Sequence, residues 1–289
     1  MVILTIAQAT LREAARRRLL IALAVLTILV AILSGWAFHR LLQIPCNDAG
    51  NARPCTPAEL KILASTLLLL LMFMFSFVLA LGAAFVGAPS IHSDVESGVI
   101  LSVLPRPIRR SEVVLGKWLG LAALLVLYAG ISCGLEFVIG RFAFDYVPPH
   151  PVLAILFMIG EALVVLTLSL AWSTRLSGIT GGIIVLVVFG ITWLAGIAGG
   201  VGAAVHSRAI QNIGTVSSLI LPTDGLWRGA IYNLEPFALL VAQRDVGRSA
   251  SANPFFSAAP APTAYVLWAL GWTLAVLGIT IWSFRRKEL

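Results

Sequence analysis

The sequence predicts an all-α membrane protein with six transmembrane helices. The prediction rests on composition, on the lengths of the apolar stretches and on the positions of the basic residues. Hydrophobic residues make up 59% of the 289 residues and charged residues only 11%, whereas a soluble domain carries about a quarter charged residues. Backbone groups inside lipid find no water to bond with, so each spanning stretch must be helical, which takes about 20 residues.

Six stretches are long and apolar enough to span a bilayer, and we expect one transmembrane domain over residues 1–289. The first stretch follows Arg16–Arg18 and could be mistaken for a signal peptide. It is too long for a signal-peptide core, and Trp36–Arg40 lacks the small side chains of a cleavage site, so we interpret it as a retained span. The expected spans, with approximate ends, are residues 19–43, 60–88, 113–138, 152–174, 178–205 and 263–284.

The basic residues predict that both ends of the chain face the cytoplasm, because Lys and Arg concentrate in short cytoplasmic loops. With the N-terminus inside, the inner segments carry Arg12, Arg16, Arg17, Arg18, Arg106, Arg109, Arg110, Lys117, Arg175, Arg285, Arg286 and Lys287. The short outer loops carry only Arg40, Arg53, Lys61 and Arg141. The net charge of +7 therefore reflects topology and contact with anionic lipids of the cytoplasmic membrane. It does not indicate a nucleic-acid partner.

Two segments flank the first span. Residues 1–18 are expected to form an interfacial helix, although they could simply be the cytoplasmic start of the first span. The polar face of this helix would carry Gln8, Arg12 and Arg16, and its apolar face Leu4, Ala7, Leu11 and Ala14. On the other side of the span, the first outer loop is rich in turn residues and contains Cys46 and Cys55. Two cysteines in such a loop on the oxidising side suit a disulfide.

The cytoplasmic loop over residues 89–111 is the most informative part of the sequence. Ser93 and Glu96 have the spacing of a capping box, which predicts the start of a short helix. That helix would run from Asp94 to Leu104 and stop at the prolines that follow, after which Ser111 would cap the third span. An apolar helix exposed to the cytosol needs a partner surface. It either docks into a soluble protein or lies in the membrane interface, and the residues alone leave both open.

The long outer segment, residues 206–259, is expected to form a re-entrant or surface-lying helical hairpin. The run Pro222–Gly225 is a turn and helix-start signal. The helix after it would have one apolar side, with Trp227 and Tyr232 at an interfacial depth. That side would carry Leu226, Trp227, Ile231 and Leu234.

No catalytic, cofactor or metal site is expected in this chain. Gly130–Gly134 matches G-x-S-x-G by letter but lies within a span, where helix packing is the better interpretation. The sequence contains no G-x-x-x-x-G-K-[ST] phosphate loop, so ATP hydrolysis would require another polypeptide. Glu136 and Glu161 are acids inside spans, and intramembrane carboxylates are functional candidates, although hydrogen-bonded packing is the alternative.

The cytoplasmic loop resembles that of the permease subunits of type 2 ATP-binding-cassette (ABC) transporters. The resemblance is carried by Asp94–Leu101, then Leu104–Ile108, then Glu112–Lys117, and by the N-terminal run Thr10–Glu13. Gly98 is followed by valine where the family commonly has threonine. The number of spans and the apolar outer segment before the last span agree with the same family.

The resemblance implies that the apolar loop helix is a coupling helix that docks into a separate ATPase subunit. The implied coupling residues are Asp94, Glu96, Gly98, Ile100, Leu101, Leu104, Pro105, Arg106 and Pro107. Two ATPase subunits, which would bind ATP and magnesium, would join two permeases, the second being another copy or a homologue. The transporter would be an exporter. Two other functions remain open: a secondary transporter that uses Glu161 as an ion site, which would require inverted repeats, and a membrane-embedded protein without transport activity.

Overall fold

The computed structural model describes residues 2–15, 18–41, 43, 45–48, 51–96, 109–236 and 253–286. Within these ranges six helices are long and apolar enough to cross a membrane, which confirms the predicted number of spans. They are α2 (Arg18–Leu41), α3 (Pro57–Gly87), α6 (Arg110–Phe144), α7 (Pro151–Ser173), α8 (Gly178–Ala204) and α12 (Thr263–Arg285). The shorter elements are α1 (Val2–Ala15), α4 (Pro89–Glu96), α9 (Arg208–Ile220), α10 (Thr223–Leu234) and the strands β1 (Cys46–Asp48) and β2 (Asn51–Arg53).

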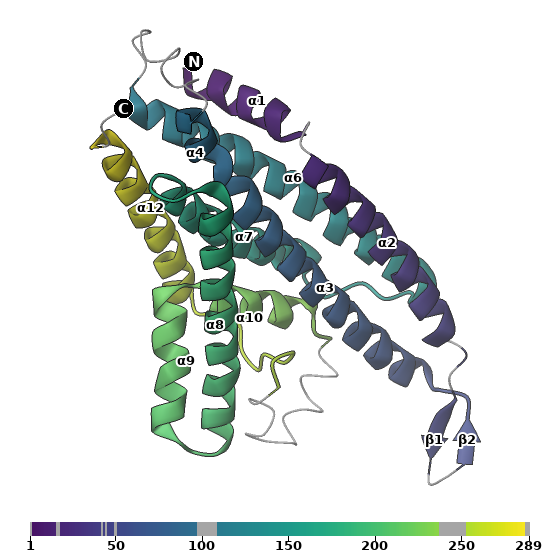
Figure 1. Ribbon diagram of the computed structural model, residues 1–289. Helices are drawn as coiled ribbons and strands as arrows, with labels where there is room; N and C mark the ends of the chain where they lie inside the picture. Colours follow the sequence, from purple (N-terminus) through teal and green to yellow (C-terminus); the bar gives the residue numbers. More distant parts are fainter. Residues whose placement is uncertain are drawn as a thin grey trace.

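The long helices form one bundle with different features at its two ends (Figure 1). Both chain termini lie at one end, together with α1, α4 and the last turn of α12. The antiparallel hairpin of β1 and β2 and the turn between α8 and α9 lie toward the other end. We call the first of these the terminal end and the second the hairpin end. Since both termini share one end, an even number of crossings is built into the fold.

Helices α3 and α7 form the centre of the bundle, and α2 and α12 lie at its edge. In the most apolar 18-residue stretch of each helix, 61% of the residues of α3 and 50% of those of α7 are buried, against 17% in α2 and in α12. Phe75 and Met72 of α3 and Leu166 of α7 are fully enclosed. The outward apolar side chains of α2 and α12 therefore face the lipid, which is a favourable solvent for them.

Glycines bring several helix pairs into close contact within this one chain. A Cβ atom added at Gly199 of α8 would lie 2.9 Å from the Cα of Gly214 of α9. The turn between the two helices includes His206 at φ 58° and lets α9 fold back along α8. By contrast, a Cβ at Gly130 or Gly134 would meet nothing within 4 Å. The G-x-x-x-G pair in α6 thus makes no close helix contact within the described part of the chain.

The described part of the outer segment contains the helices α9 and α10, and α10 lies across the bundle (Figure 1). Leu226, Trp227, Ile231 and Leu234 are all buried, so the predicted apolar side is the side that packs inward. The interfacial depth of Trp227 stays a prediction, but the residue is only 2% exposed, and its ring centroid lies 5.6 Å from that of Phe73. The Phe73 ring also contacts the rings of Phe77, Trp193 and Phe255. Trp227 therefore packs against an aromatic cluster in the core.

Two predicted helix starts are wrong. Helix α4 begins at Pro89 rather than near Ser93, since proline fits the first turn of a helix without losing a hydrogen bond. Helix α6 begins at Arg110, before Ser111, and the backbone N–H of Arg109 donates to Glu112 Oε2 at 2.9 Å. Glu112, the third residue of the helix, therefore accepts a backbone hydrogen bond at the helix start, where Ser111 was expected to be the cap.

Candidate functional site

The terminal end carries the junction that leads into the predicted coupling segment. Helix α4 follows α3 almost without interruption, because the N–H of Ala88 still donates to the carbonyl of Ala84 at 3.0 Å. Ser90 Oγ donates to the carbonyl of Gly87 at 2.7 Å, and Ser169 Oγ of α7 donates to that of Ala84 at 2.7 Å. These bonds hold the start of α4 on the end of the second span.

A buried ion pair fastens α4 to the third span. Lys117 Nζ of α6 pairs with Asp94 Oδ2 of α4 and also donates to the carbonyl of Ser90. The side chain of Lys117 is 7% exposed and that of Asp94 is 21% exposed. A charge this enclosed is tolerated only when it is paired and hydrogen-bonded, so the pair fixes the position of α4 against α6. The sequence indicated Lys117 as a basic residue of the inner side and as part of the family motif, but gave no sign of its partner.

The other predicted coupling residues have different outcomes. Glu96, the last residue of α4, is 76% exposed at its side chain and lies 3.6 Å from His92 Nε2. Asp94 and Glu96 are thus the two predicted coupling residues that lie within the described residues, at the end of α4. The remaining predicted coupling residues lie outside the described residues: Gly98, Ile100, Leu101, Leu104, Pro105, Arg106 and Pro107.

The start of α6 lies beside the end of α12. Arg110, the first residue of α6, donates through Nη1 to the carbonyls of Phe284 at 3.3 Å and Arg285 at 3.1 Å. A cation is favourable there, because the last carbonyls of a helix lack helical partners and carry its negative dipole end. Sequence reasoning missed this contact, which joins residues 174 positions or more apart.

Helix α1 lies along the start of α6, as Figure 1 shows. A Cβ at Gly116 would lie 2.7 Å from the Ile6 side chain, and one at Gly120 would lie 2.5 Å from the Ala7 carbonyl oxygen. On the predicted apolar face of α1, Ala14 is buried, whereas Leu4 is 66% exposed. The helix packs against α6 from Ile3 onward, with Leu4 on the side that faces away.

The two intramembrane acids each bond to a serine of a neighbouring helix. Ser34 Oγ of α2 donates to Glu136 Oε1 of α6 at 3.2 Å, and Ser76 Oγ of α3 donates to Glu161 Oε2 of α7 at 2.8 Å. Glu136 is 0% exposed and Glu161 is 4% exposed. This enclosure and these partners favour helix packing over an ion path.

A second polar pair that sequence reasoning missed lies between α8 and α10. Arg228 Nε donates to Asp224 Oδ2 at 2.9 Å, and its Nη2 donates to the carbonyl of Gly196 at 3.0 Å. Burial raises the pKa of Asp224, and the charge and hydrogen bond of Arg228 partly offset that rise. The spacing of four residues in a helix was a signal for this pair. Gly196 is needed beside it, since a Cβ there would overlap the Asp224 carboxylate.

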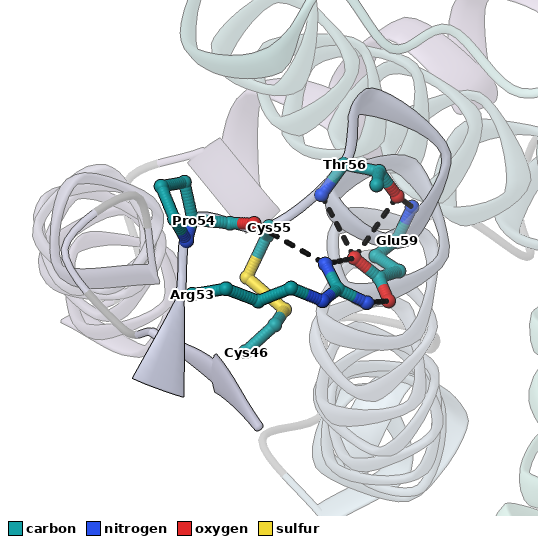
Figure 2. Close-up of a disulfide and its surroundings, with 6 residues drawn as sticks. All are labelled: Cys46, Arg53, Pro54, Cys55, Thr56 and Glu59. Carbon is teal, nitrogen blue, oxygen red and sulfur yellow. Dashed lines mark hydrogen bonds and ion pairs between the residues drawn. A yellow bond between two sulfur atoms is a disulfide. The ribbon is translucent and has the colours of Figure 1, made fainter. Parts of the chain in front are cut away.

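The hairpin end is held together by a disulfide between Cys46 and Cys55 (Figure 2). The guanidinium of Arg53 contacts both oxygens of Glu59, at 2.7 Å and 3.0 Å. Thr56 caps α3, with its N–H donating to Glu59 Oε2 at 2.8 Å and its hydroxyl accepting from the Glu59 N–H at 3.3 Å. The loop between the first two spans is therefore a cross-linked unit continuous with the start of α3.

Comparison with known proteins identifies the family. Residues 4–289 match the sequence model of the family described as ABC-2 family transporter protein. No curated protein matches the chain. The family match covers almost the whole sequence and agrees with six apolar helices long enough to span a bilayer. The chain therefore belongs to the ABC-2 family and is a multi-pass membrane permease of the ABC transporter type.

Proposed function

We propose that this permease is driven by a separate ATPase subunit that docks at the terminal end. The observation that carries the proposal is the buried pair of Asp94 and Lys117, which connects α4 to the third span. Helix α4 is in turn continuous with the second span through Ala88. A displacement of residues 97–108 would therefore reach two spans at once. This is the connection that a coupling helix needs in order to convert closure of an ATPase into movement of a permease.

The segment between α4 and α6 has the composition of a docking helix. Val99, Ile100, Leu101, Val103 and Leu104 are apolar, and an apolar helix on the cytosolic side is stable only against a partner surface. The sequence contains no phosphate-binding loop of its own. We therefore assign ATP and magnesium to the partner, of which two copies would join two permeases, as the family resemblance implies.

The proposed orientation places the terminal end in the cytoplasm and the hairpin end outside. Two observations support it. Both termini lie at one end of the bundle (Figure 1), and the disulfide of Cys46 and Cys55 lies toward the other, which suits an oxidising compartment. With this orientation the protein would sit in the cytoplasmic membrane, and the family resemblance implies that it acts as an exporter.

Co-purification tests this proposal. The permease, expressed with its neighbouring genes and purified in mild detergent, should retain an ATPase subunit. Leu101→Asp should lose that subunit, because a carboxylate would have to be buried in the docking groove without a partner. Ser102→Asp, which adds the same charge at the adjacent position, is the matched control and should retain it. Equal ATPase recovery with both variants would contradict the proposed docking site.

A further inference from the structure

A cavity of about 350 Å³ opens at the terminal end between the α7–α8 turn and the last turn of α12. It is lined by Thr174, Arg175, Ser283 and Arg286. The cavity is large enough for a phosphate group, and the polar side-chain groups of its lining residues are two guanidinium and two hydroxyl groups. It lies outside the α4 junction and outside the polar pairs described above.

The lining side chains are held in place by contacts with one another. Arg175 Nε donates to Ser283 Oγ at 3.3 Å, and the hydroxyls of Thr174 and Ser283 are 3.5 Å apart. The guanidinium of Arg286 stacks over the ring of Trp282 at 4.1 Å from its centroid. Among the described residues no carboxylate pairs with Arg175 or Arg286. Within the described part of the chain, the two positive charges are therefore positioned by neutral groups.

The surroundings of the cavity favour a lipid as the source of that anion. Helix α12 lies at the edge of the bundle, and many of its apolar side chains are exposed. Leu274 is 69% and Trp282, four residues before Arg286, is 51% exposed. An acyl chain can lie against this exposed part of α12 while its headgroup reaches the arginines. Tryptophan at this level is typical of the membrane–water interface.

We propose that this cavity binds the phosphate group of an anionic phospholipid of the adjacent leaflet. Guanidinium groups match phosphate oxygens with paired hydrogen bonds, and basic pockets between transmembrane helices are known to hold anionic headgroups. The headgroup phosphate would contact Arg175 and Arg286, with the hydroxyl of Ser283 as a third donor. The inference does not depend on the ATPase partner.

Native mass spectrometry of the full chain in detergent tests the site, with short-chain phosphatidylglycerol, short-chain phosphatidylcholine and inorganic phosphate as probes. Phosphatidylglycerol should bind in preference to phosphatidylcholine. Arg175→Gln/Arg286→Gln should weaken that binding by about fivefold for each arginine removed. Arg12→Gln/Arg109→Gln is the matched control, since it removes the same charge from exposed positions at the same end of the bundle and should leave the affinity unchanged.

Three results would overturn the inference. Equal loss of binding in the control variant would mean that total charge, rather than this cavity, attracts the lipid. Equal binding of phosphatidylcholine would show that the net negative charge of the lipid plays no part, and full occupancy by inorganic phosphate in competition with the lipid would identify a free-anion site. The melting temperatures of both double variants should match that of the wild type, which excludes loss of the fold as the cause of any change in binding.

Discussion

The buried pair of Asp94 and Lys117 gives the most specific energetic prediction. Asp94→Asn removes the carboxylate charge and leaves the Lys117 ammonium in a site where the side chain is 7% exposed. Removing one partner of a buried ion pair destabilises a protein by about 3–5 kcal/mol. Since the Ser90 carbonyl still accepts from Lys117, we expect the lower value, about 3 kcal/mol.

Removing the lysine instead of the aspartate should cost less stability. Lys117→Met leaves the Asp94 carboxylate, whose side chain is 21% exposed and can be partly hydrated, so we expect a loss of about 1–2 kcal/mol. Asp94→Leu/Lys117→Met replaces both charges with apolar groups and should come close to the wild type, as replaced buried pairs often do. At about 2–4 °C for each kcal/mol, Asp94→Asn should lower the melting temperature by about 6–12 °C.

Thermal unfolding of the purified protein in one detergent, followed for all four proteins, measures this double-mutant cycle. The expected order of stability is wild type close to the double variant, then Lys117→Met, then Asp94→Asn. Equal losses for the two single variants would contradict the unequal burial of the two charges. A double variant as unstable as the sum of the singles would show that the two side chains are not coupled, and the proposed link between α4 and α6 would fail.

Three further predictions follow from close contacts and from burial. Gly120→Leu should displace α1 and expose it to protease, because even a Cβ there would lie 2.5 Å from the Ala7 carbonyl oxygen. Gly130→Leu is the control and should leave the digestion pattern unchanged, because a Cβ there meets nothing within 4 Å. Protection of α1 in both variants would refute the packing of α1 against α6. Gly196→Ala should lower the melting temperature, because the added Cβ would overlap the Asp224 carboxylate. Gly190→Ala is the control and should leave the melting temperature unchanged, because a Cβ there meets nothing within 4 Å. Equal melting temperatures of the two variants would show that the Asp224 side chain moves aside without cost. Burial raises the pKa of Glu235 to about 8, and the hydrogen bond from the N–H of Ser257 partly offsets this rise. The folded state therefore favours the protonated carboxyl group. The protein should lose stability as the pH rises from about 4.3, the usual pKa of a glutamate, to about 8. Glu235→Gln should flatten that part of the melting-temperature profile, and an unchanged slope would remove Glu235 as its cause.

The number and type of the spanning helices could be predicted from sequence because lipid leaves few alternatives. A stretch without charges must be helical in the bilayer, and all six predicted stretches are helices of spanning length. Their ends were less predictable. The third span was expected over residues 113–138, but α6 runs from Arg110 to Phe144. Hydropathy detects where the apolar side chains stop, whereas the backbone hydrogen bonds of a helix continue through charged residues such as Arg141.

The polar contacts of the candidate site were largely beyond sequence reasoning. Asp94 was singled out by its place in a motif, but nothing in the sequence indicated that Lys117 would lie against it. The pair of Asp224 and Arg228 had the right spacing, yet its burial depends on Gly196 of another helix. Such contacts are set by how helices pack against each other, and hydropathy along a single chain does not record that packing.

The proposed mechanism requires that an ATPase subunit binds residues 97–108. Site-specific photocrosslinking from position 101 in intact membranes detects this contact, with position 36 as a lipid-facing reference, since Trp36 is 60% exposed on α2. We expect a crosslink from position 101 to a single protein that carries an ATP-binding loop, and lipid adducts from position 36. Lipid adducts from both positions, with no protein crosslinked at 101, would contradict it.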